Sequence, residues 1–399
     1  MGTAVWYSRK MSKKIYDLAL RKHRAYKGKL HILSAAPLKN KADLSWMYTP
    51  GVAGVSLAIS KKQSLVNELT IKSHTVGVVT DGSAVLGLGN IGPEAAMPVM
   101  EGKAVLFKEM AGLDAFPICI RTQETDKLVE IVENIAPVFG AINLEDISAP
   151  RCFEVEARLQ NLGIPVMHDD QHGTAIVVRA GLLNASKVTK KKFKDLKVVV
   201  NGAGAAGVAV AKLLGQRLTR TNYEIVREVV MVDSQGVIYQ GRKNLVSYKK
   251  ELARWTNKKG LRGGLEEAMS GADVFIGVSA PGVLKPAMIK NMNARPIIFA
   301  LANPIPEIMP EEAHRLRVGV IATGRSDFPN QVNNALAFPG VFKGALEGRA
   351  RAITIEMKIA ASEALARLVK KPTAAKILPE VLDSRVSLAV SKAVRRQIS

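Results

Sequence analysis

The chain has 399 residues, of which 47% are hydrophobic and 23% charged, and its formal net charge is +22. This length is sufficient for two domains with separate cores. The two cysteines exclude a disulfide framework and indicate a reducing compartment. The sequence contains neither an apolar run near the roughly 18 residues that span a bilayer nor a secretory signal. We therefore expect a globular, cytoplasmic protein.

Much of the positive charge lies at the N-terminus, where residues 1–41 contain eleven Lys or Arg and a single acid, Asp17. A basic arm favours nucleic acid, an anionic membrane or a targeting role. Zinc-finger spacing and RNA-binding motifs are absent, so we favour a solvated surface. We interpret residues 1–40 as a basic N-terminal arm, with a short helix within 12–30. Nucleic-acid binding is the non-enzymatic alternative.

The next segment contains two glycine-bearing turns. Tyr48 stands directly before Pro50-Gly51, which predicts a turn, and its position alone suggests a structural tyrosine. A β-branched strand is expected at 75–80. Residues 87–92 match Gly-x-Gly-x-x-Gly, but only two apolar residues precede the first glycine. We therefore interpret 87–92 as a tight turn rather than a dinucleotide site.

A helix is predicted over 94–104, and Pro98 is expected to break it. Lys103 lies between a glycine and an apolar run, where burial would lower its pKa towards that of a catalytic base. A lysine that extends its ammonium to solvent is the alternative. A strand at 115–120 and a helix at 125–138 are expected to follow.

Two pairs of adjacent carboxylates each follow a predicted strand. Glu145-Asp146 ends the strand at 140–144, and Asp169-Asp170 follows the strand at 163–167. The β-α-β order brings both pairs to one edge of a sheet. Oxygen ligands from two strand ends suit Mg²⁺ or Mn²⁺, so we favour a metal site over a solvated cap of the helix predicted at 175–183.

The strongest single motif is a strand at 196–201, then Gly-Ala-Gly-Ala-Ala-Gly, then an apolar helix at 208–214. This order is typical of dinucleotide-binding domains. Gly202 permits the tight turn, Gly204 lets the backbone approach a diphosphate, and Gly207 allows close packing of helix and strand. Ala205 and Ala206 complete the candidate cofactor loop.

The strand expected at 228–233 ends in Asp233, which would bind ribose hydroxyls and repel a 2′-phosphate. The sequence therefore favours NAD over NADP. Basic residues nearby keep NADP as the alternative; they are Lys212, Arg217, Arg242 and Lys243.

Further strands are predicted at 273–278, 296–302 and 318–323, and residues 342–399 have a helical pattern. The loop with Ser279 and Ala280 is of the type that passes over a nicotinamide. The amides of Asn303, Asn333 and Asn334 would bind a carboxylate without adding charge.

Several motifs in one order resemble malic enzymes, specifically the short prokaryotic type. They are Tyr-Thr-Pro-Gly-Val-Ala (48–53), Val-Leu-Gly-Leu-Gly-Asn-Ile-Gly (85–92), Gly-Lys-Ala (102–104), Leu-Glu-Asp (144–146), His-Asp-Asp-Gln-His-Gly-Thr-Ala (168–175), Gly-Ala-Gly-Ala-Ala-Gly (202–207), Ala-Asn-Pro (302–304) and Asn-Asn-Ala-Leu-Ala-Phe-Pro-Gly (333–340). The resemblance implies an α/β protein with a malic-type N-terminal domain (41–170), a Rossmann-type doubly wound NAD(P)-binding domain (171–345) and C-terminal helices (346–399).

The resemblance also implies metal-dependent oxidative decarboxylation of L-malate to pyruvate and CO₂, with reduction of NAD or NADP. The implied roles are base for Lys103, beside Asp169, and acid for Tyr48. The implied metal ligands are Glu145, Asp146 and Asp170. The implied substrate contacts are Asn303 and Asn334, and Asn303 also lies near the cofactor. A homodimer is expected by analogy.

One departure concerns Ala84, where larger members of the family have an arginine. Arg121 or Arg151 would have to replace it near the second carboxylate of the substrate. The high basic charge is also unlike the family. Alternative enzymatic hypotheses are a related 2-hydroxy-acid dehydrogenase and an oxaloacetate decarboxylase.

Overall fold

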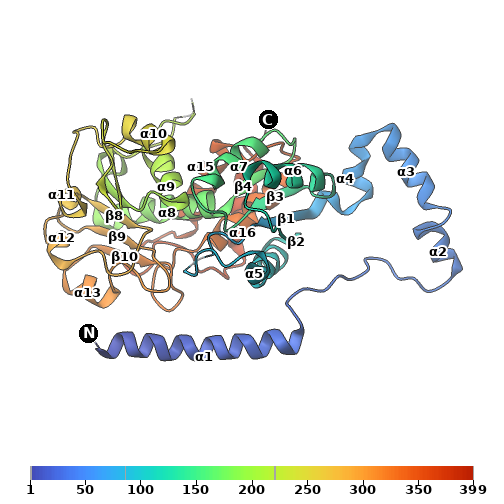
Figure 1. Cartoon of the computed structure of the whole chain (residues 1–399), viewed down its shortest axis with the longest axis horizontal. Coiled ribbons are helices and arrows are strands. Elements are labelled where there is room, and N and C mark those ends of the chain that lie inside the picture. The colour runs from blue at the N-terminus through green and yellow to red at the C-terminus, as the bar shows by residue number, and fades with distance from the viewer. Residues whose placement is uncertain (1, 86, 220–221, 399) are drawn as a thin grey trace.

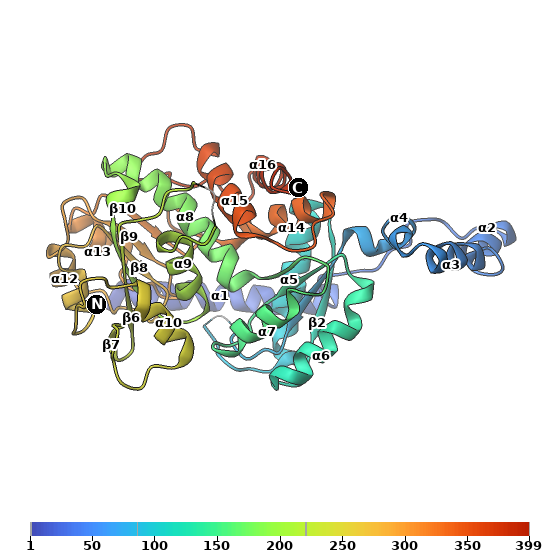
Figure 2. The same cartoon turned by 90° about the horizontal axis from the view of Figure 1, so that it is seen from above.

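The computed structural model describes residues 2–85, 87–219 and 222–398, with the backbone alone for 2–13. The chain forms two lobes, each built on a mainly parallel sheet, and a helical arm projects from one of them (Figures 1 and 2). Helix α8 (Asp169–Thr189) begins at the edge of the first sheet and packs against α9 and β9 of the second lobe. The expected α/β class is confirmed.

The first sheet has the strand order β2-β1-β3-β4, and all neighbouring strands are parallel. Its strands are β1 (Thr75–Thr80), β2 (Asp114–Cys119), β3 (Ala141–Leu144) and β4 (Val166–His168). The connecting helices are α5 (Pro93–Ala111), α6 (Thr125–Ile135) and α7 (Arg151–Leu159). The register pairs Leu144 with His168, so the residues after β3 and β4 lie at one edge, as predicted.

Two helices differ from the prediction. Helix α5 continues through Pro98 to Ala111, because a proline in the second turn removes only one hydrogen bond near the start of the helix. Helix α8 begins at Asp169 rather than Ala175. Asp169 and Asp170 therefore occupy its first turn, where the partial positive charge of the free N–H groups favours carboxylates.

The second sheet has the order β10-β9-β8-β5-β6-β7, parallel except for the β6–β7 pair. Its strands are β5 (Lys197–Asn201), β6 (Glu228–Asp233), β7 (Gly236–Val237), β8 (Val274–Gly277), β9 (Ile297–Ala300) and β10 (Val320–Thr323). Its helices are α9 (Ala205–Gly215), α10 (Ser247–Trp255), α11 (Leu265–Met269), α12 (Pro286–Lys290) and α13 (Pro310–Arg315). The predicted doubly wound architecture is confirmed.

Three C-terminal helices complete the core. They are α14 (Phe338–Glu347), α15 (Ile355–Leu368) and α16 (Arg385–Arg395), and they pack on one another, on α5 and on α8. Short 3₁₀ helices lie in the connections, at Gln63–Leu65, Ile71–His74, Ala136–Val138, Phe193–Asp195 and Asn334–Leu336. The domain boundaries at residues 40, 170 and 345 stay a prediction.

The projecting helical arm covers residues 2–69 and so extends beyond the basic arm predicted for residues 1–40. It comprises α1 (Gly2–Tyr26), α2 (Lys41–Met47), α3 (Val52–Lys61) and α4 (Val66–Leu69). Helix α1 starts earlier than the helix expected within 12–30. Helices α2 to α4 project beyond the first lobe in both views (Figures 1 and 2), and none of their residues is buried. No helix in the described ranges combines the length and hydropathy needed to cross a membrane.

Candidate active site

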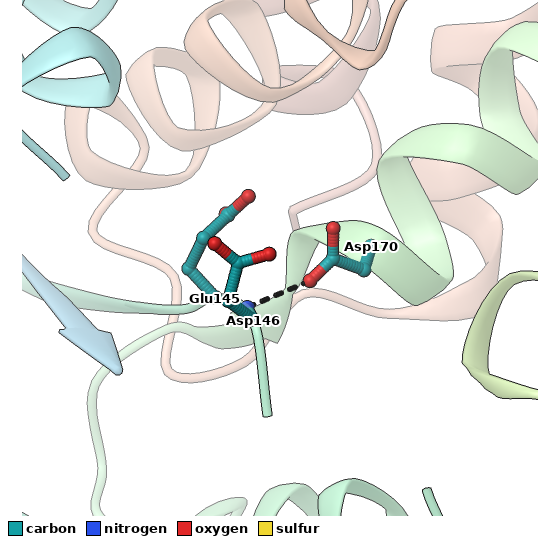
Figure 3. A group of neighbouring side chains, drawn as sticks. All are labelled: Glu145, Asp146 and Asp170. Atoms are coloured by element: carbon teal, nitrogen blue, oxygen red, sulfur yellow. Dashed lines mark hydrogen bonds between the residues drawn. The ribbon is translucent and has the colours of Figure 1, made fainter. Parts of the chain in front are cut away.

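Three carboxylates converge at the C-terminal edge of the first sheet (Figure 3). Glu145 and Asp146 follow β3, and Asp170 lies in the first turn of α8. One oxygen from each lies within 4.8 Å of the others. The Asp146 N–H donates to Oδ2 of Asp170 over 2.8 Å, which joins the two segments. Asp146 has a φ of 53°, a left-handed conformation that turns the chain sharply after β3.

Lys103 extends from α5 into this acidic cluster and is 8% exposed. Its Nζ lies 2.9 Å from Oε1 of Glu145, hydrogen-bonds Oδ2 of Asp169, and sits 4.4 Å above the ring of Phe338. Burial alone would lower the pKa of Lys103, but the charges of Asp169 and Glu145 outweigh it and raise that pKa above its ordinary value. The expectation of a lowered pKa for Lys103 was therefore wrong.

The cluster carries more negative than positive charge. Burial and the charges of Asp170, Asp169 and Asp146 raise the pKa of Glu145 well above 4.5, although Lys103 opposes this. A buried oxygen of Asp169, Oδ1, also has no hydrogen-bond partner among the residues that the structure describes. Converging carboxylate oxygens with an excess of negative charge suit a hard divalent cation, so the donor set fits Mg²⁺ or Mn²⁺.

The two lobes meet around this cluster. A methyl group added at Gly173 would lie 1.8 Å from Oδ1 of Asp169 and 3.0 Å from Cβ of Asn334. Only glycine fits there, and Asn334 therefore lies beside the first turn of α8. A methyl group at Gly87 would lie 3.1 Å from the carbonyl oxygen of Asn303. The 87–92 turn, with its Val85–Gly89 bridge, thus faces the loop after β9.

Asn333 and Arg151 lie in defined polar contacts. The Asn333 side chain accepts a hydrogen bond from the Ala335 N–H and caps a short helix. Arg151 donates to Asp81 and, over 2.8 Å, to Ser83. Ala84 follows Ser83, and its N–H donates to the carbonyl oxygen of Asp146 over 2.9 Å. Arg151, which contacts Ser83, therefore lies near the acidic cluster.

Arg121, the other candidate replacement for an arginine at Ala84, is on the surface. Its side chain is 89% exposed and pairs with Glu94 over 2.8 Å. Of the two arginines, Arg151 is therefore the one that the fold brings towards the cluster.

Tyr48 stands apart from these residues within its own chain. It follows α2 on the projecting arm, and 69% of its side chain is exposed. Figures 1 and 2 show α2 beyond the first lobe, far from the start of α8. A single chain therefore does not bring Tyr48 to the acidic cluster.

The glycine-rich loop joins β5 to α9, with Gly202 at a φ of 119°. A methyl group at Gly202 would lie 2.6 Å from the Val278 carbonyl, and one at Gly207 would lie 1.8 Å from the Gly202 carbonyl. Gly204 precedes Ala205, the first residue of α9, so Ala205 and Ala206 offer free N–H groups at a helix N-terminus. This is the geometry that binds a diphosphate.

Asp233 ends β6, as predicted, but both of its oxygens are engaged. Arg242 donates to Oδ1 over 3.0 Å and to Oδ2 over 2.5 Å, and Lys249 donates to Oδ2 over 2.7 Å. Burial alone would raise the pKa of Asp233, but these hydrogen bonds lower it to about 2. Two cations thus face one carboxylate at the ribose end of the loop.

Sequence reasoning missed Glu307, which joins two loops at the edge of the second sheet. Its fully buried carboxylate accepts the Ser279 N–H over 3.1 Å and the Ala302 N–H over 3.0 Å. Ala280 follows Ser279, and Asn303 follows Ala302. Glu307 lies five residues beyond Ala302, in the loop after β9, and belongs to no recognised motif, so the sequence offered no signal for it.

Residues 27–160 match the family model "Malic enzyme, N-terminal domain", and residues 171–399 match "Malic enzyme, NAD binding domain". The chain belongs to the malic enzyme family. Similar proteins include the bifunctional malic/malolactic enzyme of Bacillus subtilis, 53% identical over 95% of this chain and 92% of the relative. The NAD-dependent malic enzyme of Geobacillus stearothermophilus is 55% identical over 92% of this chain and 76% of the relative.

Solved structures agree with this assignment. The NAD-dependent malic enzyme of Thermotoga maritima has a TM-score of 0.90 at 50% identity, covering 94% of this chain and 98% of that one. The malic enzyme of Entamoeba histolytica has a TM-score of 0.91 at 38% identity, covering all of this chain and 84% of that one. The sequence-based assignment to the malic enzymes, decarboxylating oxidoreductases that use NAD or NADP and a divalent metal, is confirmed. The comparisons do not support the alternative hypotheses of another enzyme or a nucleic-acid-binding protein.

Proposed function

We propose that Glu145, Asp146 and Asp170 hold a Mn²⁺ or Mg²⁺ ion beside which L-malate is oxidised and decarboxylated to pyruvate and CO₂. The convergence of three carboxylates within 4.8 Å carries this proposal. A bound divalent cation supplies Lewis-acid polarisation of the substrate oxygens at this place. Asn303, Asn333 and Asn334 are proposed to bind the substrate carboxylates through their amides.

Lys103 is proposed to take the proton of the C2 hydroxyl, with Asp169 as its hydrogen-bonded neighbour. Lys103 contacts two carboxylates, Glu145 and Asp169. A cation held by Glu145 would leave Asp169 as the hydrogen-bonded carboxylate of Lys103 and would lower the pKa of Lys103 towards that of a base. Asp169 then orients the ammonium of Lys103 and compensates its positive charge.

A bound coenzyme would supply the hydride acceptor for C2. The loop of Gly202, Gly204, Ala205, Ala206 and Gly207 is proposed to hold the diphosphate. The loops with Ser279, Ala280 and Asn303 are proposed to hold the nicotinamide end. The close approach of Asn303 to Gly87 supports this, because it brings the coenzyme edge of the second sheet against the first lobe.

Tyr48 is proposed to protonate C3 after CO₂ leaves, in the active site of a second copy of the chain. Helices α2 to α4 bury none of their own residues, and large apolar side chains are exposed on them, including Trp46 at 57% and Leu57 at 60%. Short helices without a core are marginal alone in water. A homodimer that covers this arm would stabilise it and would carry Tyr48 into the partner's site.

The test is complementation between two inactive variants, Tyr48→Phe and Lys103→Met, given different tags and co-expressed. A purified heterodimer has one site with both changes and one with neither, so we expect about half of the wild-type activity, since a two-fold dimer has two equivalent sites. A dimer of two Lys103→Met chains that differ only in their tags is the matched control, because both of its sites lack Lys103. An inactive mixed heterodimer, or a monomeric wild type, would contradict the proposal.

The coenzyme is proposed to be NAD, with NADP also accepted. Asp233 would repel a 2′-phosphate if it were free, but Arg242 and Lys249 compensate its charge and leave one positive charge in excess. This arrangement supports use of both coenzymes rather than strict exclusion of NADP.

A further inference from the structure

A cavity beside the first turn of α8, lined there by Gln171 and His172, has no role in the activity described above. It encloses about 330 Å³ between α7 of the first lobe, α9 of the second, and α15. For comparison, an engineered protein cavity of about 150 Å³ holds benzene. Its apolar wall consists of Phe153, Val208, Ala209, Leu213, Leu218 and Ile355.

One end of the cavity is polar and charged. Glu156, 8% exposed, accepts hydrogen bonds from the His168 N–H over 2.9 Å and from Gln171 over 3.1 Å. Its Oε2 also lies 3.0 Å from Nε2 of His172. The oxygens of Glu156 are thus directed towards the start of α8, and the carboxylate is satisfied without Lys358.

Lys358 of α15 lines the same cavity and is 7% exposed. Apart from a longer-range attraction to Glu156, its ammonium has no hydrogen bond or ion pair with any residue in the described ranges. Burial lowers the pKa of Lys358, although Glu156 opposes this. A buried ammonium is costly unless a partner takes its N–H groups, and the cavity is where such a partner fits.

We propose that this cavity binds a small organic monoanion with an apolar body, whose anionic group pairs with Lys358. Lys212, the other lysine of the lining, already pairs with Glu251 over 3.0 Å. Among the described lining residues, the ammonium of Lys358 therefore sets the charge of the ligand, and the apolar wall selects an aliphatic or aromatic body. The ligand would touch α7 and α9 together, and would thereby bridge the two lobes. The site is separate from the metal cluster, because its lining includes none of Glu145, Asp146 and Asp170.

The test uses octanoate as the probe and 1-octanol as its uncharged counterpart, titrated calorimetrically into the full-length protein. EDTA is present throughout, so that the carboxylate of the probe cannot bind through a metal at the active site. We expect octanoate to bind at least about tenfold more tightly than octanol, which corresponds to about 1.4 kcal/mol. We expect Lys358→Met to remove this preference. Lys392→Met, at an exposed lysine of α16, is the matched control and should keep it.

A second variant guards against misfolding of Lys358→Met. Ala157 is exposed at the rim of the cavity, so Ala157→Trp should close the entrance without disturbing the core. Loss of octanoate binding in this variant is expected. Absence of octanoate binding to the folded wild type, equal binding of octanoate and octanol, or unchanged binding in either variant would overturn the proposal and leave a cavity that holds water alone.

Discussion

The pairing of Asp233 with two cations predicts how coenzyme preference responds to a single substitution. In Arg242→Met the side chain keeps its length and loses its charge. Among the described residues, Asp233 then keeps Lys249 as its one cationic partner, and the Gln235 N–H still donates to Oδ1 over 3.0 Å. A 2′-phosphate on the coenzyme then lies beside Asp233, whose negative charge is less compensated than in the wild type. The ribose hydroxyls of NAD still have the Asp233 oxygens to bind, and each oxygen has one hydrogen-bond donor fewer. We therefore expect Arg242→Met to disfavour NADP selectively.

The size of the effect follows from the charges. Two unit charges about 4 Å apart interact by about 4 kcal/mol at an effective dielectric constant of about 20. Arg242 is 11% exposed and Lys249 is 22% exposed, so solvent screens part of this interaction. Half of the full value, about 2 kcal/mol, corresponds to about a 30-fold fall in the ratio of kcat/KM for NADP to that for NAD.

The assay is steady-state oxidation of L-malate at saturating Mn²⁺, with each coenzyme varied in turn. Lys243→Met is the matched control. Lys243 is exposed in the same loop, and the ion pairs that Asp233 makes within the described residues are with Arg242 and Lys249. In Lys243→Met the ratio of kcat/KM for NADP to that for NAD should stay within about twofold of the wild-type ratio. An equally small change in Arg242→Met would refute the assignment of Arg242 to coenzyme selection.

Three further predictions concern the loops and the cluster. Gly207→Ala would place a methyl group 1.8 Å from the Gly202 carbonyl, so NADH affinity measured by fluorescence should fall at least about tenfold. Glu307→Gln sets an amide N–H against a backbone N–H in one of its two loops, so KM for both coenzyme and malate should rise about tenfold with a smaller change in kcat. Burial and neighbouring carboxylates raise the pKa of Glu145 above 4.5. The contribution of protonated Glu145 to the free energy of unfolding is therefore complete below pH 4.5, and it is lost as the pH rises through the raised pKa of the folded protein. Metal-free Glu145→Gln should therefore gain thermal stability relative to the wild type towards neutral pH, and Mn²⁺ should reverse the order.

Each of these has a clear contrary outcome. Unchanged NADH affinity in Gly207→Ala would mean that the loop does not hold the coenzyme closely. A fall in kcat alone in Glu307→Gln would mean that the acid does not position the two loops. Parallel stability curves of wild type and Glu145→Gln would mean that folding does not perturb this carboxyl group.

Much of the fold was predictable because its signals are local. The strand before Gly202 and the helix after it are continuous apolar runs separated by glycine, and the structure has them at almost the predicted residues. The two acidic pairs follow two strands that are neighbours, since a β-α-β unit brings consecutive parallel strands together. Their convergence at one edge was therefore predictable without any knowledge of side-chain positions.

The errors have non-local causes. The predicted fall in the pKa of Lys103 considered burial alone, because Glu145 and Asp169 reach it from segments more than forty residues away in the sequence. The engagement of Asp233 depends on a loop and a helix that fold back on β6. Helix α8 begins at Asp169 because neighbouring segments support its first turn, whereas the sequence suggested a start after Gly173-Thr174.

Other features had no sequence signal. Glu156, His172 and Lys358 are brought together by three helices, and each alone resembles an ordinary surface residue. The position of Tyr48 is also informative only in three dimensions. Its motif suggested a catalytic role, and the projection of the arm is the reason for our proposal that a second chain is involved.

The central claim is that this chain oxidises and decarboxylates malate at the Glu145, Asp146 and Asp170 cluster. The most direct measurement follows NADH and NADPH formation from L-malate with Mn²⁺, then with EDTA, in the wild type and in Asp170→Asn. The account predicts malate-dependent formation of NADH and pyruvate that EDTA abolishes, with a higher Mn²⁺ requirement in the variant. Folded wild-type protein that reduces neither coenzyme with Mn²⁺ present, or activity that EDTA leaves unchanged, would contradict it.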